Sequence, residues 1–252
     1  MNGQPYVNSV THQSITTIEF YHPQGNSLSS DLLRQLAKNI HSAGIDANTR
    51  VIILRSAGDR AFCGGASFDE LRSVTEAAQG LEFFNGFAKV INAIRKSPKL
   101  VIGRIHGRCV GGGVGLAAAV DYAIAREGAD IKLSELSIGF GPFVIAPALE
   151  RKMGNTAFGQ LAIDAMHWRN AEWAQKRGLY AELHQATEPM DESVSRLADA
   201  LAHSNPEATE ALKKILWKGT EHWDELMRER AATSGNLALS EFAKNAIARL
   251  RP

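Results

Sequence analysis

The spacing of apolar residues in the first part of the chain alternates between the period of a strand and that of a helix. Residues 14–21 (SITTIEFY) are β-branched and aromatic, with apolar Ile18 and Phe20 at period two. The next apolar residues recur at helical spacing: Leu28, Leu32, Leu33, Leu36 and Ile40. We predict a strand and then a helix, joined by the turn-forming HPQGNS and capped by a serine at 27, 29 or 30.

This alternation continues to about residue 133. Residues 51–55 and 100–105 have the composition of buried strands, and the helix predicted between them has an apolar face made of Leu81, Phe84, Phe87, Ile91 and Ile94. Alternating strands and helices favour parallel strands joined by crossover connections, with ligands bound at the carboxyl ends of the strands. The pattern therefore predicts an α/β fold.

From Phe143 onward the apolar pattern is almost wholly helical. We predict helices near residues 143–152, 155–166, 190–203, 206–217 and 221–250, separated by Gly154, Gly178, Pro189 and Pro206. One functional unit is expected, with a core over residues 1–190 and a helical C-terminal region over residues 191–252.

Charge and cysteine content narrow the class of protein. A net charge of +1 over 252 residues gives no basic field for nucleic acid. Cys63, Cys109 and the eight histidines show no metal-ligand spacing, so no metal is predicted. No apolar run approaches the roughly 20 residues that span a bilayer, and no leader begins the chain. We expect a soluble protein of the reducing cytoplasm with no membrane partner.

Two glycine-rich loops follow two of the predicted strands. AFCGGASFDEL (61–71) comes after the strand ending at Arg55, and GRCVGGGVGL (107–116) after the strand ending at Ile105. If these strands are parallel neighbours, Gly64 and Gly112 can aim two main-chain N–H groups at one point, with no Cβ in the way. Two such donors form an oxyanion hole, which stabilises charge on a carbonyl oxygen. The alternative is that the glycines only allow close packing of a helix on a sheet.

A second alternative for these glycines is nucleotide binding. Residues 113–118 (GVGLAA) match the G-x-G-x-x-A pattern after a strand and before a helix. A dinucleotide site requires this pattern in the first βαβ unit, with an acidic residue about 20 positions on at the end of the next strand. Here it lies in the third unit and Glu135 follows only the short IKL, so we do not favour this alternative.

A single carboxylate stands out in KLSELSIGFGPF (132–143), where Glu135 lies among apolar and small residues. A carboxylate in such surroundings costs free energy unless it is paired or its pKa rises. A raised pKa suits a general acid or base at neutral pH. The alternative is a glutamate that caps a helix or forms a salt bridge.

Together, AFCGGASFDEL, IHGRCVGGGVGLAAAVDYAIA and KLSELSIGFGPF resemble the crotonase family, the enoyl-CoA hydratase/isomerase superfamily. The resemblance covers nearly the whole chain. It implies a crotonase-like spiral of ββα units with a helical C-terminal trimerisation region, usually in a homotrimer or homohexamer. It also implies an acyl-CoA thioester as substrate, with no cofactor beyond the coenzyme A of that substrate.

Carried over by position, the resemblance assigns roles to particular residues. Gly64 and Gly112 would supply the oxyanion N–H groups, and Glu135 would be the catalytic acid/base. The thioester and pantetheine path would follow Gly64, Gly65, Ala66 and Ser67. Apart from the resemblance, the apolar residues that directly follow Glu135 are expected to shape the acyl site: Phe140, Phe143, Val144 and Ile145. In the last helix and tail, the family's contacts with the coenzyme A phosphates would fall on Lys244, Arg249 and Arg251, although a solvated helix face is an equal alternative.

Gly115 departs from the family pattern. Typical hydratases of this family carry a second glutamate there, because adding water to a 2-enoyl thioester uses two acid/base groups. Isomerases manage with one glutamate, so we favour 3-enoyl to 2-enoyl-CoA isomerisation. One alternative is a 2-enoyl-CoA hydratase with a second carboxylate from Asp69, Glu70 or Glu82. Another is a non-catalytic acyl-CoA binder.

Two further groups receive structural assignments. Phe83, Phe84 and Phe87 have helical spacing and are predicted as core, with an acyl-pocket wall as the alternative. Asp121 is predicted to make structural hydrogen bonds. Three lysines are expected at the surface: Lys213, Lys214 and Lys218.

Overall fold

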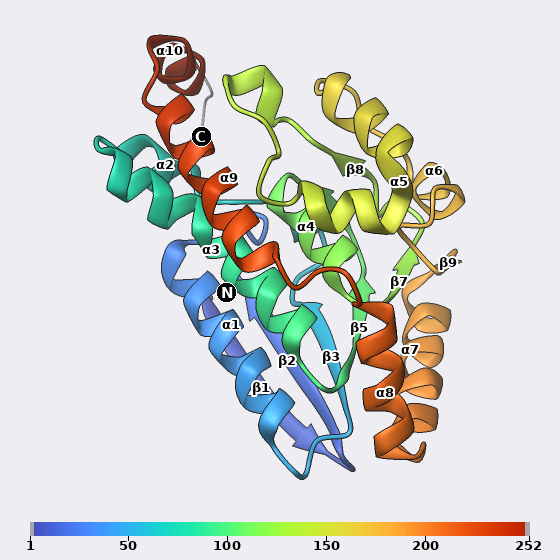
Figure 1. Cartoon of the computed structure of the whole chain (residues 1–252). Coiled ribbons are helices and arrows are strands. Elements are labelled where there is room, and N and C mark those ends of the chain that lie inside the picture. Colours follow the sequence, from blue (N-terminus) through green and yellow to red (C-terminus); the bar gives the residue numbers. More distant parts are fainter. Residues whose placement is uncertain (1–2, 250–252) are drawn as a thin grey trace.

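The computed structural model describes residues 3–249, which form two sheets surrounded by helices (Figure 1). The larger sheet has six strands in the order β1-β2-β3-β5-β7-β9. Only the β1–β2 pair is antiparallel, and every other pair in this sheet is parallel. Its strands are β1 (Tyr6–His12), β2 (Ile15–Tyr21), β3 (Val51–Ser56), β5 (Leu100–Ile105), β7 (Tyr122–Arg126) and β9 (Glu182–His184).

The smaller sheet contains three short parallel strands: β4 (Ala61–Cys63), β6 (Arg108–Val110) and β8 (Ile131–Lys132). Along the chain, β3, β5 and β7 of the larger sheet are each followed by one strand of the smaller sheet and then by helix. This repeated ββα unit confirms the predicted α/β spiral. Because parallel strands end at the same edge, the loops after β4, β6 and β8 are brought side by side.

The helices of the ββα units are α1 (Ser30–Ile45), α2 (Phe68–Ser73), α3 (Ala77–Lys96), α4 (Gly112–Ala119), the 3₁₀ helix η1 (Glu135–Ile138) and α5 (Ala146–Ile163). The predicted serine cap of the first helix is Ser29, whose side chain accepts a hydrogen bond from the N–H of Leu32. Gly154 interrupts α5 with a φ of +77°, as its predicted role as a separator requires.

The remaining helices are α6 (Ala171–Lys176), α7 (Thr187–Ala202), α8 (Pro206–Leu216), α9 (Trp223–Ala238) and α10 (Glu241–Arg249). Pro189 does not separate helices, because it lies in the first turn of α7, where the N–H group that proline lacks has no intrahelical partner. The single helix predicted over 221–250 is divided into α9 and α10. Residue 250 of that prediction lies outside the described residues, as does Arg251, one of the predicted phosphate contacts.

Strands β1 and β9 were not predicted from the sequence, and β4 and β6 lie in the two segments that were predicted as glycine-rich loops. β1 (YVNSVTH) is an exposed edge strand without apolar alternation, and β9 has three residues. Neither gives the period-two signal of a half-buried strand.

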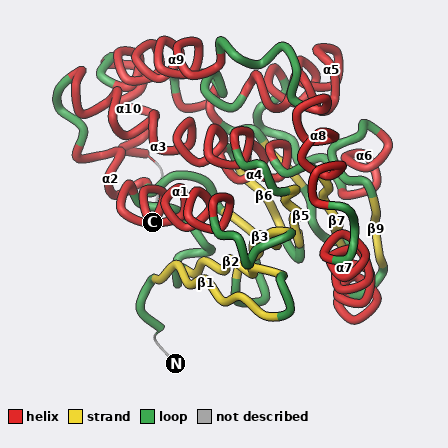
Figure 2. Tube along the Cα trace, turned by 60° about the horizontal axis from the view of Figure 1, so that its bottom comes forward, coloured by secondary structure: helices red, strands yellow, loops and turns green. Residues whose placement is uncertain are grey.

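α7 packs on one face of the larger sheet, where Met190 and Val194 contact Ile102 and Ile124. The predicted core boundary at residue 190 falls inside this helix. In Figure 2, α9 runs along α3, while α7 lies apart from both, beside β7 and β9. Within residues 3–249, no helix is long and apolar enough to cross a membrane.

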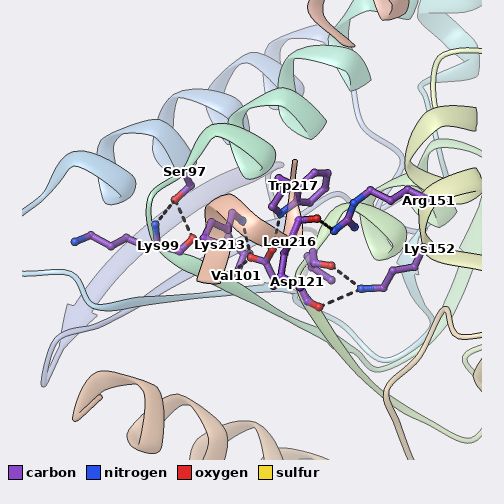
Figure 3. Close-up of polar contacts among 10 residues, drawn as sticks. Ser97, Lys99, Val101, Asp121, Arg151, Lys152, Lys213, Leu216 and Trp217 are labelled. Atoms are coloured by element: carbon purple, nitrogen blue, oxygen red, sulfur yellow. Dashed lines mark hydrogen bonds and ion pairs between the residues drawn. The ribbon is translucent and has the colours of Figure 1, made fainter. Parts of the chain in front are cut away.

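Asp121 joins α8 to the larger sheet (Figure 3). Its carboxylate accepts hydrogen bonds from the Val101 N–H at 2.7 Å, Lys213 Nζ at 2.5 Å and Trp217 Nε1 at 2.7 Å. This confirms the predicted structural role of Asp121. The surface prediction for Lys213 is wrong, since its side chain is 3% exposed, whereas Lys214 and Lys218 are exposed. Packing of α8 against the end of β5 buries Lys213 beside its counter-ion.

Candidate active site

A pocket, here called the central pocket, lies where the two glycine loops meet the segment after β8. Its lining comes from five parts of the chain: residues 64–71, 83–87, 110–112, 134–145 and Ser234. The predicted convergence of the two glycine loops and the glutamate segment is therefore correct. The loops meet because β4, β6 and β8 are neighbouring parallel strands.

The glycines bring main chain close to the carboxylate. Gly111 has a φ of +52°, and a Cβ at this position would lie 2.8 Å from Oε1 of Glu135. Gly65, with a φ of +92°, belongs to the first loop, and a Cβ there would lie 3.8 Å from the nitrogen of Gly112. Residues with side chains rarely adopt these φ values, and a Cβ at Gly111 would crowd the carboxylate.

Gly64 does not offer its N–H group to the central pocket. That N–H donates to the carbonyl oxygens of Gly25 at 3.0 Å and Asn26 at 3.3 Å. A Cβ at Gly64 would lie 2.9 Å from the Gly25 oxygen, so this loop is pressed against residues 25–26. Gly64 lines the pocket, but the expectation that it supplies an oxyanion donor is wrong, because its N–H is already paired.

The N–H group of Ala66, two residues after Gly64, points away from residues 25–28. Leu28 N–H donates to Gly65 O at 2.8 Å, and Ser67 N–H donates to Leu28 O at 3.0 Å. In this parallel bridge the N–H of Ala66 points away from Leu28, on the side of the pocket that Ala66 lines. No group among residues 3–249 accepts a hydrogen bond from this N–H.

Gly112 is the first residue of α4, where the N–H groups have no intrahelical acceptor. Its N–H likewise has no acceptor within the described part of the chain. The Phe87 ring explains why position 112 is glycine, since a Cβ there would lie 2.3 Å from that ring. Ala66 and Gly112 thus contribute two unpaired main-chain donors to the pocket lining.

Glu135 is the first residue of η1 and lines the same pocket. Its Oε2 atom is buried and has no hydrogen-bond partner within residues 3–249, nor does any ion pair reach the side chain there. Burial raises the pKa of Glu135 to about 7. The alternative of a salt-bridged glutamate is therefore not supported, and the carboxyl group can both take and give a proton near neutral pH.

The position of Gly115 is closed to a second acid. A Cβ at residue 115 would lie 2.4 Å from Cγ2 and 2.7 Å from Cβ of Ile145. Among the described residues lining the pocket, Glu135 is the only carboxylate. The other acids considered from the sequence are held outside the pocket: Asp69 by Arg72, Glu70 by Ser30 and Glu82 by Lys89.

The same close packing weakens the nucleotide alternative. A Cβ at Gly113 would lie 2.3 Å from the carbonyl oxygen of Cys63, and the space beside Gly115 is filled by Ile145. Protein atoms therefore occupy the approach that a pyrophosphate needs at these glycines. Among the residues that the structure describes, no group of three or more His, Cys, Asp or Glu side chains is placed to hold a metal ion.

Apolar side chains make up most of the pocket wall. The rings of Phe84 on α3 and Phe140 pack edge to face with centroids 5.0 Å apart. The helix-spaced aromatic residues of α3 serve both as core and as wall, so the two assignments made from the sequence are compatible. The lining includes Phe83, Phe84, Phe87, Ile138, Phe140, Phe143, Val144 and Ile145.

Not every predicted binding residue reaches the pocket. Ser67 is the N-cap of α2, where its hydroxyl accepts from the Glu70 N–H at 3.4 Å, and it is not part of the lining. Lys244 is exposed on α10, also outside the lining. Phe143 does line it.

Two residues of α9 were not predicted from the sequence. Arg230 donates from Nη1 to the Phe143 carbonyl oxygen at 3.3 Å, and Ser234 lines the pocket. No local sequence signal marks them, since only packing of α9 on α3 brings them here.

Comparison with known proteins agrees with this arrangement. A probable enoyl-CoA hydratase of Bacillus subtilis (strain 168) is 28% identical over 237 residues, 93% of this chain and 91% of that protein. A peroxisomal Delta(3,5)-Delta(2,4)-dienoyl-CoA isomerase of Arabidopsis thaliana is 27% identical over 211 residues, 78% of this chain and 74% of that protein.

The fold has a solved counterpart as well. The crystal structure of enoyl-CoA hydratase from Bacillus halodurans superposes with a TM-score of 0.90 at 22% identity, covering 97% of this chain and 100% of that one. The sequence profile described as enoyl-CoA hydratase/isomerase matches residues 10–246. This chain therefore belongs to the enoyl-CoA hydratase/isomerase family.

Proposed function

We propose that this protein isomerises a 3-enoyl-CoA to the corresponding 2-enoyl-CoA. The observation that carries the proposal is the single carboxylate of the central pocket: Glu135 lines it, and Ile145 fills the space beside Gly115. Moving a double bond needs one group that takes a proton and returns it elsewhere. Adding water needs a second acid/base group, and the described lining contains no second carboxylate.

The N–H groups of Ala66 and Gly112 bind the thioester oxygen in this proposal. The charge that develops there when the α-proton leaves is stabilised by donors already in place. In this proposal Ala66, and not Gly64 as expected from the sequence, supplies the first oxyanion N–H group. The Gly112 N–H also lies at the N-terminus of α4, where the helix dipole favours negative charge.

Glu135 moves the proton. Its carboxylate takes a proton from C2, and the C–H electron pair delocalises into a dienolate that spans the thioester oxygen to C4. The resulting carboxylic acid gives the proton to C4, which leaves the double bond between C2 and C3. A carboxyl group with a pKa of about 7 suits both steps, because neither protonation state is strongly favoured.

The coenzyme A portion is proposed to leave the pocket along Gly64, Gly65, Ala66 and Ser67, with Lys244 contacting its phosphates. Lys244→Ala should then raise KM for acyl-CoA and leave KM for the matching acyl-pantetheine thioester unchanged. An equal effect on both would remove Lys244 from the proposal. We further propose a homotrimer or homohexamer, which light scattering measures directly.

The experiment that tests the reaction uses two substrates separately, a 3-enoyl-CoA and a 2-enoyl-CoA, with products identified by chromatography and mass. We expect interconversion of the isomers without gain of water. A 3-hydroxyacyl-CoA as the main product would overturn the proposal and indicate a hydratase.

A further inference from the structure

Ser234 places a buried hydroxyl group against the central pocket. The residue is 1% exposed, and its Oγ atom has no hydrogen-bond partner within residues 3–249. Only two buried side-chain polar atoms of the described lining are unpaired in this way, Ser234 Oγ and Glu135 Oε2. Buried polar groups are normally paired, so an unpaired hydroxyl on a residue that lines a cavity is available to a partner that enters the cavity.

Contacts on either side hold Ser234 in place. At the neighbouring residue, α9 touches the main chain of α3, since a Cβ at Gly235 would lie 2.7 Å from the carbonyl carbon of Gly80. One turn earlier, Arg230 donates to the Phe143 carbonyl oxygen. These two contacts hold the backbone of α9 against α3 and the segment after η1 on either side of Ser234.

The surroundings of this hydroxyl are apolar. Aromatic and aliphatic side chains form most of the pocket wall, and Glu135 is assigned to the reacting carbons. A purely hydrocarbon acyl chain would fill the pocket and leave the Ser234 hydroxyl unpaired. Sites that hydrogen-bond a substrate oxygen discriminate strongly against analogues that lack this oxygen. The buried protein group then has no hydrogen-bond partner.

We propose that Ser234 is a specificity residue that hydrogen-bonds a hydroxyl substituent on the acyl chain beyond C4. The proposal rests on the proposed function for the thioester and for the position of the reacting carbons. The substrate class is thus a hydroxylated acyl-CoA.

Binding of unreactive ligands tests this inference separately from the reaction. Saturated hexanoyl- and octanoyl-CoA are titrated calorimetrically beside their hydroxylated analogues, substituted at C5 or C6 of the hexanoyl chain and at C5, C6 or C7 of the octanoyl chain. The wild-type protein should bind at least one hydroxylated ligand about 10-fold or more tightly than its unsubstituted parent. Ser234→Ala should bind that pair within about twofold of each other. Because none of these ligands can isomerise, failure of the isomerase assay leaves this result interpretable.

Thr233→Ala is the matched control. Its exposed hydroxyl donates to the Glu229 carbonyl oxygen within α9 and does not line the central pocket, so the preference for the hydroxylated ligand should persist. Ser234→Ala should fold normally, with a melting temperature no lower than wild type, because it removes an unpaired buried hydroxyl.

Three results would overturn the inference. One is a wild-type protein that binds every unsubstituted ligand as tightly as its hydroxylated analogues, and another is a Ser234→Ala variant that keeps the preference. A third is that Ser234→Ala abolishes conversion of a 2-enoyl-CoA to a 3-hydroxyacyl-CoA while acyl preference is unchanged, which would assign the hydroxyl to a reacting water.

Discussion

Cγ2 of Ile145 lies 2.4 Å from the point where a Cβ at position 115 would be, so Ile145 occupies the space of any side chain at Gly115. Packing therefore accounts for the absence of a glutamate at position 115, because Ile145 occupies the space that its side chain would need. α4 and the segment leading into α5 are fitted together without room for an acid at that position. Gly115 on α4 and Ile145 just before α5 therefore together limit the site to one carboxylate.

Gly115→Glu should lower the free energy of unfolding by about 1–3 kcal/mol or more, because an overpacked core side chain forces its neighbours to move. It should create no hydratase activity. Chemical denaturation measures the loss, and Gly115→Glu combined with Ile145→Ala should recover part of it. A Gly115→Glu variant as stable as wild type that hydrates 2-enoyl-CoA would show that the space exists.

Glu135→Gln should reduce kcat for isomerisation by about 10²–10⁴-fold, the usual contribution of general acid/base catalysis. The amide nearly preserves the shape of the side chain, so the Kd of a saturated acyl-CoA should change little. Asp69→Asn is the control, since that carboxylate is outside the pocket lining. Unchanged turnover in Glu135→Gln would exclude the residue from the proton transfer.

The rate should depend on pH through the same group. Glu135 acts first as a base, so kcat/KM should rise with pH and level off above its pKa of about 7. Glu135→Asp should keep a rising profile, while residual activity of Glu135→Gln should lose it. A wild-type profile that is flat from pH 5 to 8 would contradict this assignment.

Stability should change with pH in the opposite direction. Burial raises the pKa of Glu135 from 4.5 in the unfolded chain to about 7 in the folded protein. Between these values the folded state binds more protons, so its stability falls as pH rises through the window. Glu135→Gln removes this loss and should be more stable than wild type above pH 7, by at most about 3 kcal/mol. The two proteins should converge below about pH 4.5, and denaturation at pH 4, 6 and 8 measures the difference.

The oxyanion donor at position 112 is tested by two variants that add the same Cβ. Gly112→Pro removes the N–H, whereas Gly112→Ala keeps it, and both displace the Phe87 ring. The proline variant should have a kcat lower than the alanine variant by about 10²–10³-fold, the effect of losing one oxyanion donor. Circular dichroism and oligomer size confirm folding. Equal rates in the two would exclude this N–H from catalysis.

Local sequence patterns determined much of this protein. Apolar periodicity predicted β2, β3, β5, α1 and α3, because each period fixes which face a residue turns to the core. The loops after the strands and the isolated Glu135 were also visible, since parallel strands bring their carboxyl ends to one edge. The chain pattern therefore predicted the class of fold and the meeting of the two glycine loops, while the place of Glu135 beside them was implied by the family resemblance.

The tertiary structure decided which groups are free to act. Pairing with residues 25–28 uses the N–H of Gly64 and turns that of Ala66 to the pocket, and residue type gives no sign of this direction. Lys213 is buried because α8 meets Asp121, 92 positions earlier in the chain. Ser234 lines the pocket because α9 packs along α3, in close contact at Gly80. Residue types set local conformation and burial preference, but hydrogen-bond direction and pocket shape depend on which distant segments pack together.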